Sequence, residues 1–425
     1  MLSLEEQLDT LRRGVDAVVP DEEFVAKLDR SIKTGRPLRV KYGIDPTGID
    51  VHLGHTVPLR KLRQFQDLGH VAVIIIGNYT ALVGDPSGRD ETRLALTEAQ
   101  VEANAKDYLR QVGRIIDLGR AEVHHNGDWF SKWSFLDVLD LTRKMTLGQI
   151  SARDDFAKRI AAEKPVYLHE CLYPLMQGWD SVEIKADVEL GGSEQLFSLM
   201  VARGLQQGQG QPAQVAMTMP ILVGTDGTRR MGKSLGNYIG VAEDPVSQFA
   251  KIMSIPDAPM RQYFTLLTDL PLAEVDRWLD PSINPRDAKE ALGKAVVTQY
   301  SGAEAAEHAS LEFRRRAKRE DPDEIPDVAA KFPTETAGPM FLPNLIVNEL
   351  KFDASTSNVR RMIEQKGVTI GAERLIVVDG KAVVEPLAGQ GKVRLVQADS
   401  IHVFEADDFI VRYGKRKIAR VRFEA

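Results

Sequence analysis

The stretch Val71–Ile76 reads VAVIII, six apolar residues in a row, and Gly77 ends it. Because the run lacks the alternation of a strand with one wet face, it predicts a strand that is buried on both faces. Such strands occur in sheets that carry helices on both sides. Further strand candidates lie at 38–44 and 221–223, and helical patterns between them lie at 56–68 and 98–115. This alternation predicts an α/β fold with a doubly wound parallel sheet.

The composition is typical of a soluble globular protein. The 425 residues are 43% apolar and 27% charged, and this length favours two or three domains. No apolar run approaches the roughly 20 residues of a membrane-spanning helix. Met1–Arg12 is acidic and polar, unlike a signal peptide, so we expect a cytoplasmic protein that does not enter the membrane. The single cysteine, Cys171, excludes an internal disulfide, and its apolar neighbours indicate a buried structural thiol.

Changes in texture along the chain predict an α/β domain, a helical domain, a linker and a small α+β domain. In that order, these are residues 1–240, 241–325, 326–340 and 341–425. Asp244 and Pro245 are typical of a helix start, and the linker is rich in Pro, Asp, Glu and Thr. The last domain has a helical pattern at 356–366 and a strand pattern at 415–423, where arginines alternate with apolar residues.

The segment Asp45–His55 reads DPTGIDVHLGH and falls between a predicted strand and a predicted helix. A helix N-terminus offers unpaired N–H groups and positive potential to a phosphate. Gly54 permits close approach of the backbone to a ligand, and His52 and His55 can donate hydrogen bonds to phosphate oxygens. One alternative is a turn with two incidental histidines. Another is a metal site, but no further Cys or His lies at ligand spacing, so we predict none.

The segment Arg229–Asn237 reads RRMGKSLGN and follows a glycine-rich turn at 224–227. A loop with several cations and a hydroxyl group can close on a polyphosphate. A solvated basic loop is the alternative, and it is the commoner explanation of a single charge run. The presence of the histidine motif in the same chain favours a phosphate site.

Both motifs have counterparts in a known family. HLGH at His52–His55 resembles the His-Ile-Gly-His signature of class I aminoacyl-tRNA synthetases. RMGKS at Arg230–Ser234 resembles their Lys-Met-Ser-Lys-Ser loop, with Arg for the first Lys and Gly for the first Ser. Other nucleotidyltransferases share the histidine motif, so it indicates the chemistry better than the substrate. The resemblance implies a Rossmann-like catalytic domain at 1–240, with ATP as a substrate and Mg²⁺ bound to it.

Three further segments resemble the tyrosyl enzymes of this class, in their bacterial type. They are Gly77–Arg89 (GNYTALVGDPSGR), Tyr173–Asp180 (YPLMQGWD) and Gly191–Gln195 (GGSEQ). Tyr173, Gln177 and Asp180 are spaced i, i+4 and i+7, so they share one face of a helix. Tryptophanyl enzymes normally lack the aspartate. The resemblance implies activation of L-tyrosine with ATP and its transfer to tRNA(Tyr). A tryptophanyl enzyme and an inactive RNA-binding relative are the alternatives.

The resemblance also implies a role for each site residue. Catalytic, phosphate-binding roles fall to His52, His55, Arg89, Arg93, Arg230, Lys233 and Ser234. Tyrosine-binding roles fall to Asp85, Tyr173, Gln177, Asp180, Gln195 and Lys41. ATP-binding roles fall to Asp45, Thr47, Gly54, Gly192, Glu194 and Met231. Within the second group, Asp180 would take the phenol hydroxyl, and Asp85, Tyr173 and Gln177 would hold the ammonium.

Besides Arg230 and Gly232 of the basic loop, the chain departs from the family pattern at Tyr300–Gly302, which replaces a common Tyr-His-Gly, and at two positions of the proposed site. Lys41 stands where a second phenol-binding Tyr is common, with Tyr42 beside it, and either could shape the pocket. Glu194 stands where an Asp usually binds the ribose of ATP. Its extra methylene should shift the carboxylate or make it act through water.

The C-terminal segment 341–425 resembles the S4-like RNA-binding fold. The resemblance is carried by Ser355–Ile363, Gly367–Ile370 and Gly414–Lys417. RNA phosphates would be met by Arg360, Arg361, Lys415 and Lys417. A solvated basic surface is the alternative. The family further implies that 241–325 binds the anticodon and that the protein is a homodimer, because tRNA is thought to bridge the subunits.

Overall fold

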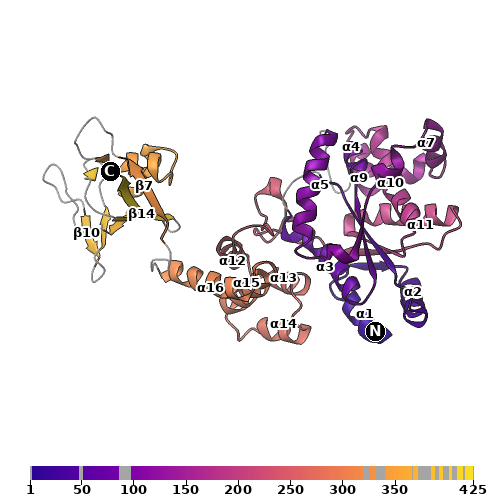
Figure 1. Ribbon diagram of the computed structural model, residues 1–425, viewed down its shortest axis with the longest axis horizontal. Helices are drawn as coiled ribbons and strands as arrows, with labels where there is room; N and C mark the ends of the chain where they lie inside the picture. Colours follow the sequence, from indigo (N-terminus) through magenta and orange to yellow (C-terminus); the bar gives the residue numbers. More distant parts are fainter. Residues whose placement is uncertain are drawn as a thin grey trace. The chain divides into compact units, whose positions relative to one another are not determined.

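The computed structural model divides into two compact units, residues 1–307 and 308–425 (Figure 1). The residues that it describes are 2–46, 51–85, 97–318, 325–331, 340–365, 367–371, 384–387, 392–395, 402–403, 409–414 and 417–424. Over these residues, no helix has both the length and the apolar character needed to span a bilayer.

The first unit is built on a six-stranded sheet in the order β1-β6-β5-β2-β3-β4. The strands are β1 (Ala17–Val19), β2 (Arg39–Ile44), β3 (Val71–Ile76), β4 (Ala121–His125), β5 (Val188–Gly192) and β6 (Val215–Met219). Strands β2 to β6 run parallel, and β1 joins the edge antiparallel to β6. The predicted α/β fold with a parallel sheet is confirmed.

Helices connect these strands and cover both faces of the sheet. Up to the last strand they are α1 (Leu4–Arg12), α2 (Asp21–Thr34), α3 (Leu53–Asp67), α4 (Thr80–Val83), α5 (Glu98–Val112), α6 (Gly127–Phe130), α7 (Phe135–Thr142), α8 (Leu147–Ser151), α9 (Asp154–Ala161), α10 (Leu168–Ile184) and α11 (Leu196–Gly208). Alternate side chains of β3 join different cores. Ile74 belongs to the cluster that holds Leu59 and Leu62 of α3, whereas Ile75 clusters with Ile184 of α10. The sheet is therefore doubly wound.

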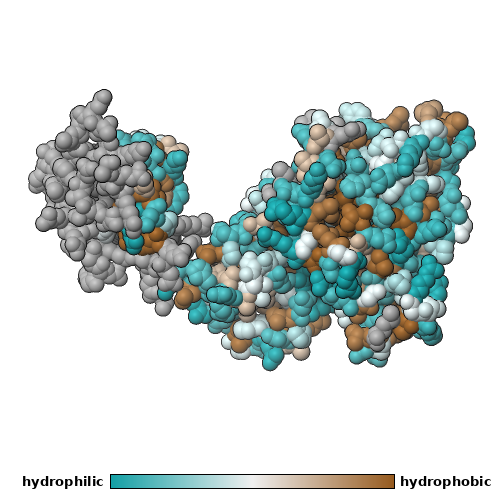
Figure 2. Space-filling view, in the orientation of Figure 1, coloured by the Kyte–Doolittle hydropathy of each residue, from teal (hydrophilic) through white to brown (hydrophobic). Residues whose placement is uncertain are grey.

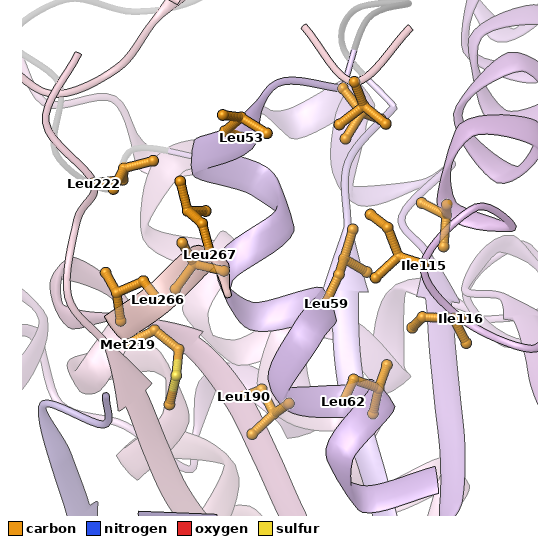
Figure 3. Packing of buried hydrophobic residues seen from close by; sticks show 14 of the residues in the cluster. Leu53, Leu59, Leu62, Ile115, Ile116, Leu190, Met219, Leu222, Leu266 and Leu267 are labelled. Atoms are coloured by element: carbon orange, nitrogen blue, oxygen red, sulfur yellow. The ribbon is translucent and has the colours of Figure 1, made fainter. Parts of the chain in front are cut away.

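The helical segment after the sheet contains α12 (Pro245–Met253), α13 (Met260–Leu267), α14 (Leu272–Trp278), α15 (Pro285–Ser301) and α16 (Ala303–Lys318). Asp244 caps α12 as the sequence predicts, because its carboxylate accepts the backbone N–H of Ser247 at 3.0 Å. Leu266 and Leu267 of α13 share one buried cluster with Met219 of the sheet (Figure 3). The helices up to residue 307 thus fold with the sheet around a common core.

The second unit contains a six-stranded sheet, a two-stranded sheet and short helices. Its elements after α16 are β7 (Asp327–Lys331), β8 (Met340–Phe341), α17 (Leu342–Asn344), a π-helical turn (Leu345–Glu349), α18 (Thr356–Glu364), β9 (Val368–Gly371), β10 (Val384–Leu387), β11 (Lys392–Leu395), β12 (His402–Val403), β13 (Phe409–Tyr413) and β14 (Lys417–Glu424). Val359 and Ile363 of α18 pack in one core with Val411 and Val421 of the sheet. The expected α+β character of this unit is confirmed.

Two expected elements differ from the structure. Residues 221–223 form no strand, and Val223 makes only an isolated bridge to Arg230. The strand lies earlier, at β6, and it ends before Pro220, which has no N–H to donate. The segment 326–340, expected to be a linker, contains β7, which pairs in parallel with β14. Val328 packs against the core of the second unit, so even a polar segment gains from this pairing.

Cys171 was expected to be buried, but it is partly exposed on α10. The reason is helical periodicity, because Leu168 lies one turn earlier on the same side of α10 and is 83% exposed. The apolar neighbours of Cys171 therefore do not mark a buried face.

Truncating the shared core should destabilise the whole first unit. We expect Leu267→Ala to lower the free energy of unfolding by about 2–5 kcal/mol, because the side chain is 1% exposed between the helices and the sheet. Leu272→Ala, at a site that is 48% exposed, is the matched control and should stay within about 0.5 kcal/mol. Chemical denaturation measures both. Separate transitions for sheet and helices in either variant would contradict the common core.

Candidate active site

The strand order reverses between β2 and β5. From β2 the chain proceeds outward to β3 and β4, whereas β5 leads to β6 on the other side. At such a switch point the loops after neighbouring strands diverge and leave a crevice at the carboxyl edge of the sheet. A cavity of about 490 Å³ lies there. Of the predicted site residues, its lining contains Asp45, His52, Gly54, His55, Asp85, Tyr173, Gly192, Glu194, Gln195, Arg230, Met231, Lys233 and Ser234.

The histidine motif forms the N-terminus of α3. His52 is the N-cap residue, and its ring stacks on the ring of His55 with 3.7 Å between centroids. Burial lowers the pKa of His52 to about 4 and that of His55 well below its ordinary value, and nearby Lys233 lowers both further. The two imidazoles are therefore neutral at pH 7 and can donate N–H groups without charge. A Cβ at Gly54 would lie 3.0 Å from the His52 ring, so only glycine leaves this end of the helix uncrowded.

The basic loop reaches the cavity from the segment after β6. Its base is fixed by Asn237, whose Oδ1 accepts the Gly232 N–H at 2.9 Å and whose Nδ2 donates to Asp226 at 2.7 Å. Asp226 also accepts the backbone N–H groups of Thr228 and Arg229, and these bonds hold the pKa of its carboxyl below its usual range. The hydrogen bonds present the cations of 230–233 to the cavity next to the histidines.

Carboxylates gather at another part of the same cavity. The hydroxyl of Tyr173 donates to Asp45 Oδ2 at 2.9 Å, and Gln195 Nε2 donates to Asp85 Oδ2 at 3.5 Å. Burial raises the pKa of Glu194, and the charge of Asp85 adds to this effect. The cavity therefore offers hydrogen-bond acceptors for a cationic or hydroxylated group at one part, and cations for an anion at another.

Asp180 is buried on α10. It accepts hydrogen bonds from Trp129 Nε1 at 3.1 Å and Asn126 Nδ2 at 3.4 Å. A chain of hydrogen bonds joins it to the cavity wall, because Asn126 also donates to Thr80, and Thr80 donates to Asp45. Burial raises the pKa of Asp180 to about 7, against the lowering effect of Lys41 and of its two hydrogen bonds.

Comparison with known proteins places this geometry in a family. Residues 33–318 match the family of class I tRNA synthetases described for tryptophan and tyrosine (W and Y). The tyrosine–tRNA ligase of Moorella thermoacetica is 44% identical over 420 residues, which are 98% of this chain and 95% of that protein. The tyrosine–tRNA ligase of Symbiobacterium thermophilum is 44% identical over 430 residues, 99% and 98% of the two chains. The chain belongs to the tyrosine–tRNA ligase family.

Solved structures of more distant proteins share the fold of this tyrosine–tRNA ligase family member. A C-terminally truncated mitochondrial tyrosyl-tRNA synthetase of Aspergillus nidulans has a TM-score of 0.60 at 24% identity, covering 74% of this chain and 94% of its own. The tyrosyl-tRNA synthetase of Archaeoglobus fulgidus, solved with L-tyrosine, has a TM-score of 0.58 at 23% identity, covering 72% and 100%.

Not every predicted residue lines the cavity. Lys41 is fully buried, with its ammonium 2.9 Å from Glu189, and the neighbouring Tyr42 lines the cavity instead. Adjacent residues of a strand point to opposite faces, so only one of the two can do so. Gln177 and Asp180 are buried outside the lining as well. Thr47, Arg89, Arg93 and Lys415 lie outside the described residues.

Several polar residues at the site were not predicted from the sequence. Tyr108 lines the cavity, and Asn126 and Trp129 hold Asp180. Trp129 follows β4 by a few residues, so its place after a strand of the parallel sheet was an available signal. Tyr108 lies in α5, whose apolar periodicity indicates only a face that packs on the core. Nothing in the sequence distinguishes Tyr108 from the other residues of that face.

The predicted RNA-binding residues that the structure describes lie in the second unit. Arg360 and Arg361 are exposed on α18, and Arg361 donates to Asn358 Oδ1 at 3.0 Å. Lys417 is exposed on β14, where its ammonium donates to the carbonyl of Phe352 and lies over the ring of Tyr413. Their cations remain accessible to solvent.

The raised pKa of Asp180 predicts how stability depends on pH. In the unfolded chain this carboxyl ionises near its ordinary value of 3.8, and in the folded protein it ionises only near 7. Its contribution is therefore fully present below about pH 4 and is lost as the pH rises through 7. Relative to Asp180→Asn, the wild type should lose up to about 4 kcal/mol between pH 4 and 8. Denaturation at several pH values measures this, and a constant difference would contradict the raised pKa.

Proposed function

We propose that this protein ligates L-tyrosine to tRNA(Tyr) in two steps at the cavity described above. One observation supports this proposal most directly. A single cavity is lined both by the histidine motif with the basic loop and by the carboxylates next to Tyr173. A nucleoside triphosphate and an amino acid can bind there together, with the carboxylate of the amino acid facing the α-phosphate of the triphosphate.

In the first step a carboxylate oxygen of tyrosine attacks the α-phosphorus of ATP. A new P–O bond forms, the bond to the bridging oxygen breaks, and pyrophosphate leaves. Because the nucleophile belongs to the substrate, the protein needs no strong base, and its contribution is positioning and charge stabilisation. His52 and His55 would donate to phosphate oxygens, and Arg230, Lys233 and Ser234 would bind the leaving pyrophosphate. Arg89 and Arg93 would act with them.

Mg²⁺ would enter with ATP, bound by phosphate oxygens and water. Within the described residues, no group of three or more His, Cys, Asp and Glu could hold a metal ion by itself. The carboxylates of Asp45, Asp85 and Glu194 nevertheless line the cavity and suit a hydrated cation. When bound, the ion would neutralise phosphate charge.

Tyrosine would be selected at the acidic part. Its ammonium would be held by Asp85, Tyr173 and Gln177, and its phenol hydroxyl would be met by Asp180. A ligand that lacks the hydroxyl would leave Asp180 with only the donors Trp129 and Asn126, and a lost hydrogen bond to a buried acceptor costs about 1–3 kcal/mol. Lys41 would contribute from inside the sheet, outside the cavity lining, and Tyr42 would line the site. Asp45, Thr47, Gly54, Gly192, Glu194, Gln195 and Met231 would hold the adenosine and the carboxylate.

In the second step the terminal ribose hydroxyl of tRNA(Tyr) attacks the adenylate carbonyl carbon, and AMP leaves. We propose that residues 1–240 carry both steps, that 241–325 bind the anticodon, and that the S4-like segment 341–425 binds tRNA phosphates. Arg360, Arg361 and Lys417 support the last assignment because their exposed cations lie in one small unit. Such contacts position RNA without reading its sequence. A cytoplasmic location stays a prediction.

A homodimer is supported by exposed apolar side chains between α7 and the start of α10. They are Phe135, Leu136, Leu147, Ile160, Tyr167 and Leu168. Brown side chains reach the surface around α7 (Figure 2). Side chains of this size are usually covered, and an apolar surface of this kind is typical of a protein interface.

Pyrophosphate exchange tests the proposed function. We expect ATP–pyrophosphate exchange without tRNA to be driven by tyrosine and hardly at all by phenylalanine or tryptophan, because only tyrosine satisfies Asp180. Each amino acid is added in turn to the purified protein, and label exchange into ATP is measured. Exchange driven by tryptophan would favour a tryptophanyl enzyme. Absence of exchange with every amino acid would favour an RNA-binding protein without catalysis.

The oligomeric state tests the apolar surface. Leu168→Asp places a charge on a side chain that is 83% exposed, and it should convert a dimer to a monomer in analytical ultracentrifugation. Leu272→Asp, at an exposed leucine of α14, is the control and should leave the dimer intact. A monomeric wild type, or a Leu168→Asp protein that remains dimeric, would contradict the assignment.

A further inference from the structure

The parallel sheet contains a fully buried ion pair, and the mechanism above gives no role to its acidic member, Glu189. Lys41 of β2 and Glu189 of β5 are register partners on adjacent strands, and their charged atoms lie 2.9 Å apart. Both side chains are at most 1% exposed. Removing two charges from water is costly, and apolar residues of similar volume often stabilise a core better. The presence of a buried pair is therefore weak evidence for a stabilising role.

Besides Lys41, Glu189 contacts Gln177 of the proposed tyrosine site directly. Its Oε1 accepts a hydrogen bond from Gln177 Nε2 at 3.1 Å. Its Oε2 accepts from Ser181 Oγ at 3.0 Å and from Gln214 Nε2. The ammonium of Lys41 donates to the Gln177 carbonyl at 2.7 Å, so backbone and side chain of this glutamine are both held.

This arrangement decides which end of the Gln177 amide faces Glu189. A carboxylate paired with an ammonium only accepts hydrogen bonds, so it must meet the NH₂ end of the amide. The other end, Oε1, is buried and has no hydrogen-bond partner within the described part of the chain. A buried acceptor without a partner is costly in a folded protein. Gln7, Gln211 and Gln248 share this feature among the described residues, but Gln177 lies one turn from Tyr173 on α10, and Tyr173 lines the cavity.

We propose that Glu189 is a positioning residue, which fixes the Gln177 amide so that Oε1 accepts an N–H of the substrate ammonium. This inference rests on the proposed function, in which Gln177 holds the ammonium of tyrosine. Lys41 compensates the charge of Glu189, so the pair orients the amide without itself attracting a cation. Without the carboxylate, the amide can rotate by half a turn and place its NH₂ group against the ammonium.

Two tyrosine analogues separate orientation from general damage. Tyramine keeps the ammonium and the phenol, whereas 3-(4-hydroxyphenyl)propionate lacks the ammonium. In Glu189→Gln the new side-chain amide at position 189 can either donate to or accept from Gln177. The orientation of the Gln177 amide is then no longer fixed. We expect the dissociation constant of tyramine to rise about tenfold, as for loss of one charge-assisted hydrogen bond. That of the propionate should change less than about twofold.

The ratio of the two dissociation constants, measured on one sample by calorimetry, does not depend on the folded fraction. Ser181→Ala is the matched control. It removes one bond to Glu189 Oε2 and one from Lys41 Nζ but leaves the bond between Gln177 and Glu189 Oε1, so the ratio should be unchanged. Lys41→Met with Glu189→Met removes both charges, leaves no buried charge unpaired, and should reproduce the tyramine-specific loss.

The kinetic constants give a second readout. In the pyrophosphate exchange reaction, Glu189→Gln should raise the KM for tyrosine while kcat changes little. An equal loss of affinity for both analogues would overturn the inference and leave a packing role for the pair. A wild-type protein without tyrosine-dependent exchange would refute the proposed function instead, so the two failures are distinct.

Discussion

The reversal of strand order between β2 and β5 is the constraint on which the site depends. In a parallel sheet the carboxyl ends of all strands lie on one edge. The chain proceeds from β2 to one side of the sheet and from β5 to the other, so a crevice opens between the segments that follow these two strands. The loop after β2 leads into α3 and its histidines. The end of β5 and the turn after it contribute Gly192, Glu194 and Gln195, and the segment after β6 leads to the basic loop. Segments far apart in the sequence thereby line one cavity.

Burial of charge is the second constraint, and it acts differently at three places. Lys41 and Glu189 neutralise each other inside the sheet. Asp180 accepts hydrogen bonds from Trp129 and Asn126, and burial raises its pKa against the lowering effect of Lys41. The two histidines respond in the opposite direction and stay neutral. The two histidines are thus uncharged hydrogen-bond donors beside the proposed phosphates. Asp180, beside the proposed phenol, is an acceptor whose carboxyl group titrates near neutral pH.

The sequence predicted the elements that depend on a few neighbouring residues. It did not predict the features that depend on contacts between distant segments. The strand at 71–76 and the cap at Asp244 follow from runs of a few residues, and both are present. Glu189 was missed because its partners are on another strand and on α10, which no local pattern connects. The strand β7 was missed because pairing with β14, rather than its own composition, stabilises it. Whether Lys41 or Tyr42 faces the cavity depended on strand register, which the sequence left open.

The proposed mechanism requires the histidine motif and the basic loop to act on one bound triphosphate. A double-mutant cycle on the rate of tyrosyl-adenylate formation tests it most directly, with His52→Asn, Lys233→Ala and the double variant compared with the wild type. We predict that the effects are not additive, with a coupling of at least about 1 kcal/mol, because both side chains would bind phosphate groups of the same ATP molecule. Effects that add within about 0.3–0.5 kcal/mol would show independent action and contradict the shared site.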